Sequence, residues 1–128
     1  MRILLDTHAL LWWLAGNPRL SHLAHRAIDN DANTIFVSAA SAWEIATKHR
    51  VGKLAHADAV ALDVTGSIAG QGFQELEITV DDAERAGRLP GPHRDPFDRM
   101  LIAQALARNL AMVSMDRMFD GYGVHRLW

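Results

Sequence analysis

The chain has no cysteine among its 128 residues. This absence excludes disulfide bonds, thiolate zinc sites and a cysteine nucleophile. Any bound metal must therefore take oxygen or imidazole ligands. A chain without cysteine also fits a reducing compartment, and we expect a cytoplasmic protein.

Long apolar runs are missing as well. The first apolar stretch, residues 3–14, is interrupted by Asp6, Thr7 and His8, so it resembles neither a membrane span nor a signal peptide. Hydrophobic residues make up 49% of the chain and charged residues 22%, as in an ordinary globular protein. We therefore expect residues 1–128 to form a single soluble domain without membrane contact.

A large excess of charge is also absent, because the formal net charge is -2. This balance argues against the broad phosphate binding of strongly basic proteins, so a nucleic-acid ligand would need a local basic patch. Two segments are candidates for such a patch, 48–53 and 85–99, although either could be solvated surface.

What the sequence does contain is a regular alternation of strand and helix patterns. Short apolar, β-branched segments alternate with segments of helical periodicity, which predicts an α/β fold with a parallel central sheet. The expected strands are 2–6, 34–37, 76–79 and 111–114, and the expected helices are 8–15, 21–30, 38–52, 58–69, 80–88 and 97–108.

Four acidic residues stand where these predicted elements meet. Asp6 closes the first strand, Asp98 opens the helix after a proline-rich loop, and Asp116 follows the last predicted strand. Glu44 lies early in the helix after the second strand. Ligands of parallel sheets bind outside the carboxyl ends of the strands, so we expect the four carboxylates to converge at that edge.

Four carboxylates in one site repel one another and raise each other's pKa unless cations neutralise them. Their convergence therefore predicts bound metal, and oxygen ligands favour Mg²⁺ or Mn²⁺. The chemistry that fits such a site is hydrolysis of a phosphodiester bond.

Each acid also has a purely structural interpretation. Asp98 and Asp95 could cap a helix, and Asp116 could form an Asx-turn. Glu44 alone would be expected on a solvent-exposed helix face. Asp6 differs from these, because a carboxylate that ends an apolar strand needs a partner such as a metal ion or an arginine.

Four blocks of the chain resemble the successive blocks of VapC-type PIN-domain toxins. They are RILLDTHALLWWL, SAASAWEIATKHRVGKL, HRDPFDRMLIAQAL and VSMDRMF, and they extend over residues 2–120. Their order makes the resemblance far more specific than scattered acids would be. The resemblance implies a PIN-like three-layer α/β/α sandwich with a mainly parallel central sheet.

The resemblance also implies functional residues. Asp95, three residues before Asp98, is an accessory candidate, and Thr7 and Ser114 could each orient a carboxylate or simply cap a helix. The family's acidic quartet binds Mg²⁺ or Mn²⁺ and supports endonucleolytic cleavage of RNA, and its members here would be Asp6, Glu44, Asp98 and Asp116.

The partners that the resemblance implies are RNA, a cognate VapB-type antitoxin that inhibits the nuclease, and a second copy of the chain in a homodimer. Trp12, Trp13 and Trp43 could contact such partners, although packing in the core is the simpler role. Charge near the acidic edge suggests a set of RNA phosphate contacts, namely Lys48, Arg50, Lys53 and Arg99.

Several other classes compete with this interpretation. His22 and His25 share a helix face, but no further ligand has the spacing of a zinc site. An aspartyl-nucleophile phosphatase would need a second aspartate where His8 stands, and a signalling receiver domain would need a lysine after Lys53. A nonenzymatic PIN-like binding module and a structure-specific DNA nuclease stay open as alternatives. The short chain lacks room for the additional elements of such DNA nucleases, which favours RNA.

Overall fold

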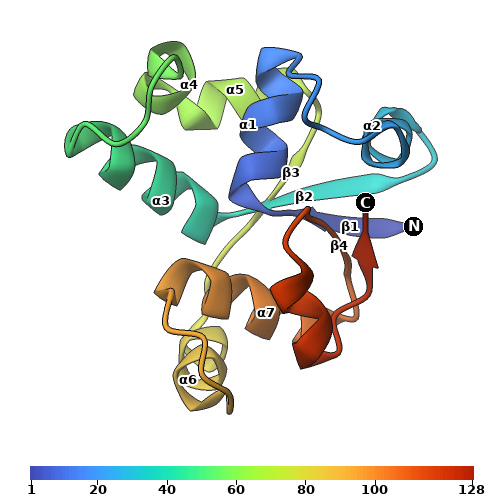
Figure 1. Ribbon diagram of the computed structural model, residues 1–128, viewed down its shortest axis with the longest axis vertical. Coiled ribbons are helices and arrows are strands. Elements are labelled where there is room, and N and C mark those ends of the chain that lie inside the picture. Colours follow the sequence, from blue (N-terminus) through green and yellow to red (C-terminus); the bar gives the residue numbers. More distant parts are fainter.

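Five parallel strands form the centre of the computed structural model, which describes residues 1–128 (Figure 1). They are ordered β3-β2-β1-β4-β5, and every neighbouring pair is parallel. Parallel neighbours need crossover connections, which explains the alternation of strand and helix patterns in the sequence. The strands are β1 (Arg2–Leu5), β2 (Thr34–Ser38), β3 (Gln74–Leu76), β4 (Ala111–Val113) and β5 (Arg126–Leu127).

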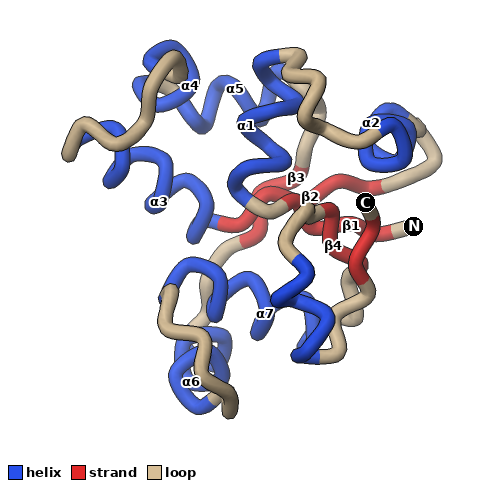
Figure 2. The backbone as a smooth tube through the Cα atoms, viewed as in Figure 1, coloured by secondary structure: helices blue, strands red, loops and turns tan.

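Helices cover both faces of the sheet, so the molecule has three layers. In Figure 2 the red strands form a band between two groups of blue helices. This arrangement confirms the expected α/β/α sandwich with a parallel central sheet. The helices are α1 (Thr7–Ala15), α2 (His22–Asp29), α3 (Ala39–Arg50), α4 (Asp58–Leu62), α5 (Val64–Gly70), α6 (Val80–Arg88), α7 (Pro96–Arg108) and the 3-10 helix η1 (Arg117–Tyr122).

The apolar core lies on both faces of the sheet because side chains alternate along each strand. On β1, Ile3 and Leu5 pack with buried residues of α1, α2 and α5, whereas Leu4 packs with residues of α7 and η1. Helix α3 contributes to both clusters through Ile45 and Ala40. Burial of these apolar side chains is the main force that holds the three layers together.

A buried polar network joins α6, α7 and β2 behind the second cluster. The Gln104 side chain accepts a hydrogen bond from the Ser38 hydroxyl at 2.6 Å and donates one to Asp82 at 3.2 Å. Arg108 donates two further hydrogen bonds to the Asp82 carboxylate, at 2.9 and 2.8 Å. Each buried polar group therefore has a partner, as buried polar groups require.

Polar caps fix where the helices after the strands begin. Asp6 accepts a hydrogen bond from the backbone of α1, and Ser38 does the same for α3. Asp95 caps α7, where Pro96 occupies the first turn without loss of a needed N–H group. These caps confirm the helix starts that the sequence indicates near positions 6, 38 and 95.

The expected helix over residues 58–69 is instead two short helices. The chain is extended at Asp63, whose φ is −152°, and the Asp63 side chain caps α5 by accepting a hydrogen bond from Gly66 at 2.9 Å. A Cβ at Gly66 would overlap that carboxylate, so the glycine makes the cap possible. The single-helix prediction was wrong because this local cap competes with helix continuation.

Two other expectations differ from the structure. The third strand lies at Gln74–Leu76 rather than 76–79, because Glu77 bonds the Gln104 side chain through its carbonyl and Thr79 caps α6. The sequence pattern predicts no element after Asp116, where the structure has η1 and β5. Both segments are too short to show a hydrophobic period.

Short strands form both edges of the sheet. The edge strand β3 has three residues and the opposite edge strand β5 has two. The central strand β1 pairs with β2 on one side and β4 on the other. The carboxyl end of β1 therefore has a neighbouring strand on each side.

Aromatic residues are divided between core and surface. Trp12 and Trp13 pack against the first apolar cluster, as the simpler interpretation of this pair predicts. Trp43 is 62% exposed and meets the Phe97 ring edge-on, with 4.9 Å between ring centroids. No helix in the chain has the length and hydropathy needed to span a membrane.

Candidate metal centre

Asp6 is a buried carboxylate at the carboxyl end of the central strand. Its side chain is only 7% exposed and accepts hydrogen bonds from the Ala9 N–H at 2.8 Å and the Ser114 hydroxyl at 2.5 Å. No basic side chain lies within ion-pair distance of it. Asp6 is thus held in place by neutral donors and has no cation to balance its charge.

The pKa of Asp6 shows the consequence of this burial. Burial raises the pKa of the Asp6 carboxyl, and the two hydrogen bonds and the nearby His8 only partly oppose that rise. The charge of Glu44 adds to the rise in pKa. Removal of a carboxylate from water disfavours its charged form, so a cation bound here would be stabilised strongly.

Asp98 lies in the first turn of α7, beside the same edge of the sheet. Burial, together with the charges of Asp95 and Glu44, raises the pKa of Asp98 to about 6, although a hydrogen bond to His93 works against the rise. The Nε2 atom of His93 lies 2.9 Å from Asp98 Oδ2. The imidazole therefore occupies one face of this carboxylate.

Glu44 and Asp116 complete the acidic group from two other elements. Glu44 is buried in α3 and forms an ion pair with Lys48 one turn further along the helix. Asp116 is exposed, caps η1 by accepting a hydrogen bond from the Met118 N–H at 2.9 Å, and donates its own N–H to the Ser114 hydroxyl. Ser114 therefore links the loop that carries Asp116 to Asp6.

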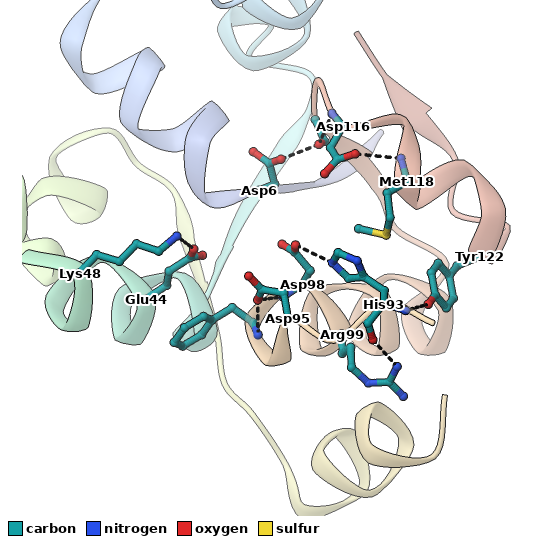
Figure 3. A network of polar contacts seen from close by, with 12 residues as sticks. Asp6, Glu44, Lys48, His93, Asp95, Asp98, Arg99, Asp116, Met118 and Tyr122 are labelled. Atoms are coloured by element: carbon teal, nitrogen blue, oxygen red, sulfur yellow. Dashed lines mark hydrogen bonds and ion pairs between the residues drawn. The ribbon is translucent and has the colours of Figure 1, made fainter. Parts of the chain in front are cut away.

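Figure 3 shows that these side chains come from four separate elements and lie around one region of the molecule. Asp6 and Asp116 approach it from the ends of β1 and β4, Asp98 from α7, and Glu44 from α3. The influence of Glu44 on the pKa of both Asp6 and Asp98 agrees with this closeness. The structure thus brings together the four acidic residues that the sequence pattern singles out.

The acids nevertheless do not form a closed metal cage. No three acidic or histidine side chains are arranged closely enough around one point to hold an ion. Glu44 turns toward Lys48, and Asp98 turns toward His93. The donor chemistry still fits a hard divalent cation, because Asp6 is a buried oxygen donor without a cationic partner.

The accessory candidates have defined structural roles. Asp95 accepts hydrogen bonds from the backbone N–H groups of Phe97 and Asp98, so it fixes the start of α7. Thr7 donates its hydroxyl to Ser41 at 3.0 Å, which ties α1 to α3 rather than contacting an acid. Of the three candidates, only Ser114 bonds directly to a carboxylate of the site.

His93 is a residue of the site that the sequence analysis missed. It lies on the loop between α6 and α7, and its backbone carbonyl accepts a hydrogen bond from Arg99 at 2.9 Å. Nothing in the sequence spacing distinguishes His93 from the other six histidines. Only the path of the loop places its ring against Asp98.

The suggested RNA contact at Arg99 needs correction. Its guanidinium donates to the backbone carbonyls of Ala86 at 3.0 Å, Leu89 at 2.5 Å and His93 at 2.9 Å. These hydrogen bonds hold the loop before α7, so the Arg99 guanidinium is not free to bind a phosphate. The sequence shows that Arg99 is next to Asp98, but it does not show the loop whose carbonyls surround the guanidinium.

The remaining basic candidates are divided between two places. Lys48 lies at the border of the acidic group and pairs with Glu44 alone. Arg50 and Lys53 are exposed, form no ion pair and lie at or just past the end of α3, which runs away from the sheet (Figure 1). The zinc candidates His22 and His25 are both exposed, and His25 packs against Trp13.

Comparison with known proteins identifies the family. The model of the PIN domain matches residues 3–124. Ribonuclease VapC22 of Mycobacterium tuberculosis (strain ATCC 25618 / H37Rv) is 32% identical over 120 residues, which cover 90% of this chain and 87% of the relative.

Solved structures show the same fold at low sequence identity. VapBC2 from Rickettsia felis, crystallised with a promoter DNA fragment, matches with a TM-score of 0.70, 15% identity and full coverage of both chains. Mycobacterium tuberculosis VapC20, described as a Sarcin-Ricin loop cleaving toxin, matches with a TM-score of 0.68, 19% identity and 95% coverage of each chain. The match to the family model and the identity to Ribonuclease VapC22 show that the chain belongs to the PIN-domain family, in its VapC-type branch.

Proposed function

We propose that this chain is the toxin of a type II toxin–antitoxin system and acts as a Mg²⁺- or Mn²⁺-dependent endoribonuclease. Two similar proteins support this by their names, since one is a ribonuclease and the other a toxin that cleaves the Sarcin-Ricin loop. The observation that carries the proposal is Asp6, a buried carboxylate that faces further carboxylates and has no cationic partner.

In this proposal Asp6 and Asp98 hold the cation, and Glu44 and Asp116 complete the set of oxygen donors. A divalent cation supplies neutralisation of the phosphodiester charge and makes a water molecule easier to deprotonate. Ser114 orients Asp6 by its hydrogen bond. In this proposal the Glu44–Lys48 ion pair and the Asp98–His93 hydrogen bond open, so that both oxygens of each carboxylate can serve as ligands.

Opening of the Glu44 pair would also free the Lys48 ammonium group. Lys48 is partly buried beside the acids, whereas Arg50 and Lys53 lie further out. Once released, the ammonium can bind an RNA phosphate next to the reacting one. We assign Arg50 and Lys53 to the more distant part of the RNA backbone, and Arg99 no longer belongs to this set.

The partners follow from the same resemblance. A solved neighbour is a VapBC complex, which supports a VapB-type antitoxin as the inhibitor of this chain. We also propose that the chain forms a homodimer, with exposed Trp43 as an aromatic residue available at an interface. Both partners can be examined with the protein used to test the nuclease.

The test compares purified wild-type chain with Asp6→Asn on total RNA and on single-stranded DNA, with Mg²⁺, Mn²⁺ or a chelator. We expect RNA cleavage that needs the metal and falls by at least about 100-fold in Asp6→Asn, because a negatively charged ligand is lost. Metal should also raise the melting temperature of the wild type but not of Asp6→Asn.

The matched control is Asp31→Asn, which removes an exposed carboxylate that forms no ion pair. Cleavage in the chelator, or full activity in Asp6→Asn, would contradict the proposal. Cleavage of DNA alone would favour the DNA nuclease, and absence of both cleavage and metal binding would favour a binding module. Antitoxins of this type are usually encoded beside the toxin, so the product of the neighbouring reading frame should inhibit cleavage when it is added. Size-exclusion chromatography of the same sample tests the dimer.

A further inference from the structure

A cavity of about 720 Å³ lies beside the acidic group, between the loop after α6, the C-terminal half of α7 and the 3-10 helix η1. Cavities of roughly 300 to 1,000 Å³ are the usual size of sites for small organic ligands. None of the four proposed metal ligands lines it. The residues that line it include Leu89, Pro92, His93, Leu106, Met118 and Tyr122.

The cavity and the candidate metal centre share one neighbouring residue, His93. This residue forms part of the cavity wall, and its Nε2 atom lies 2.9 Å from the Asp98 carboxylate. Figure 3 shows His93 between Asp98 and Tyr122, with Met118 on the same side. A ligand in the cavity would therefore lie next to a phosphate held at the acids.

The lining combines apolar and aromatic surface with an unused hydrogen-bond donor. The Tyr122 hydroxyl accepts the His93 backbone N–H at 3.3 Å but donates to no group of the protein. Gly91 lies over this hydroxyl with φ at +98°, and a Cβ there would come within 2.7 Å of the oxygen. The glycine thus allows the loop to close one side of the cavity against Tyr122.

Two basic residues are sequence neighbours of residues that line the cavity. Arg94 follows His93 in the loop, and Arg117 precedes Met118 in η1. Both arginines are exposed, and neither forms an ion pair. The backbone of a nucleotide is negatively charged, so exposed and unpaired guanidinium groups on these two segments suit a nucleotide as the occupant.

We propose that this cavity, defined by the α6–α7 loop, α7 and η1, is the subsite for one unpaired RNA base next to the phosphate that is cleaved. The inference rests on the proposed nuclease function and extends it to substrate selection. Splayed bases that stack on aromatic rings and bond through their polar edges are the usual basis of sequence-specific RNA recognition. Here Tyr122 supplies both the ring and the hydroxyl donor.

Methionine methyl groups offer a test that needs neither metal nor cleavage. The chain has five methionines; Met118 lines the cavity, Met100 lines a neighbouring apolar groove and Met112 is in the core. Millimolar uridine, cytidine or adenosine is added to protein labelled with ¹³C at the methionine methyls. We expect the Met118 resonance to shift, while those of Met100 and Met112 stay in place.

A pair of tryptophan substitutions then tests the location. Leu106 is partly exposed in the cavity wall, and Leu106→Trp fills the cavity from there. This substitution should weaken nucleoside binding about tenfold or more, because that is the effect of losing one base-stacking contact. Leu62→Trp adds the same ring at an exposed position outside the cavity and should leave binding unchanged. Tyr122→Phe, which keeps the ring, should weaken binding less and change which nucleoside binds best.

Three outcomes would overturn the proposal. They are a shift confined to Met100, no shift with any nucleoside, and equal binding by Leu106→Trp and the wild type. The cavity would belong to a protein partner instead if the Met118 resonance did not shift with nucleosides but shifted when the product of the neighbouring reading frame was added. Uncharged nucleosides are not repelled by the carboxylates, so a failure of the nuclease proposal leaves this measurement interpretable.

Discussion

Asp82 and Asp6 are both buried aspartates, yet their surroundings give their carboxyl groups opposite pKa shifts. Burial acts to raise the pKa of Asp82, but hydrogen bonds from Arg108, the Thr79 backbone and Gln104 outweigh it and bring the pKa to about 2. Asp6 has no arginine, so burial dominates and its pKa rises. The first carboxylate stabilises the fold, whereas the second stays available for a cation.

The lowered pKa of Asp82 predicts a pH-dependent contribution to stability. The ionised form stabilises the folded chain by about 2 kcal/mol above the ordinary pKa of 3.8, and this contribution is lost as the pH falls toward 2. Asp82→Asn should therefore lower the free energy of unfolding at pH 7 by about 2 kcal/mol and flatten its decrease with acid. Urea denaturation at a series of pH values measures both effects.

The control for this prediction is Asp81→Asn on the same helix. Asp81 is exposed and its ion pair with Arg85 is open to solvent, so its removal should cost under about 1 kcal/mol. Equal losses in the two variants would show that the buried network does not stabilise the chain more than a surface pair does.

At the scale of single residues, the sequence predicted the acids better than their partners. Asp6 could be identified because a carboxylate that ends an apolar strand is unusual and needs a partner. His93 could not, because its contact with Asp98 depends on the path of a loop. Arg99 was misinterpreted for the same reason, since a charge in the sequence does not show which carbonyls surround it.

The loop between α6 and α7 is held in place by the Arg99 side chain. Arg99 donates to the carbonyls of Leu89 and His93 in the loop and to that of Ala86 in the last turn of α6. The Tyr122 hydroxyl accepts a hydrogen bond from the His93 N–H. Through this loop the same arginine sets the position of the imidazole next to Asp98. A planar guanidinium can bind three carbonyls at once in a way that an ammonium group cannot.

Arg99→Lys should therefore loosen the loop while keeping the charge. We expect a loss of about 2 kcal/mol in the free energy of unfolding, since at least one buried carbonyl loses its partner. Amide hydrogen exchange of residues 86–95, followed by mass spectrometry, should become faster. Arg94→Lys is the matched control, because Arg94 is exposed and forms no ion pair.

If Arg99→Lys instead weakened RNA binding without any change in hydrogen exchange, Arg99 would be a substrate contact after all.

Of the helices, α6 has the bounds that the sequence predicted, and the structure shows a capping box at its start. The break at Asp63 was not predicted, because the apolar spacing continues across it. The cap at Asp63 depends on a side-chain contact that hydrophobic spacing does not reveal.

At the scale of the whole molecule, two apolar clusters depend on one sheet. Leu5 points into the cluster that holds Trp12 and Trp13, and Leu4 points into the other. Both side chains are fully buried. The parallel sheet and its two covered faces followed from the alternation of patterns in the sequence, whereas the order of the strands required the structure.

This arrangement predicts that the layers unfold together. Leu4→Ala and Leu5→Ala should each lower the free energy of unfolding by about 2 to 5 kcal/mol, and each should shift the tryptophan fluorescence and circular dichroism transitions by the same amount. Leu62→Ala, at an exposed position, is the control and should have little effect. Separate transitions in Leu4→Ala would mean that the two faces are independent.

The two edges of the sheet have a consequence for the chain before it meets any partner. An edge strand exposes unpaired N–H and C=O groups that can recruit another chain and start aggregation. Here β5 has only two residues and β3 three, so each edge offers a very short template. A newly made copy should thus remain dispersed as a monomer or a specific assembly rather than grow by edge-to-edge stacking.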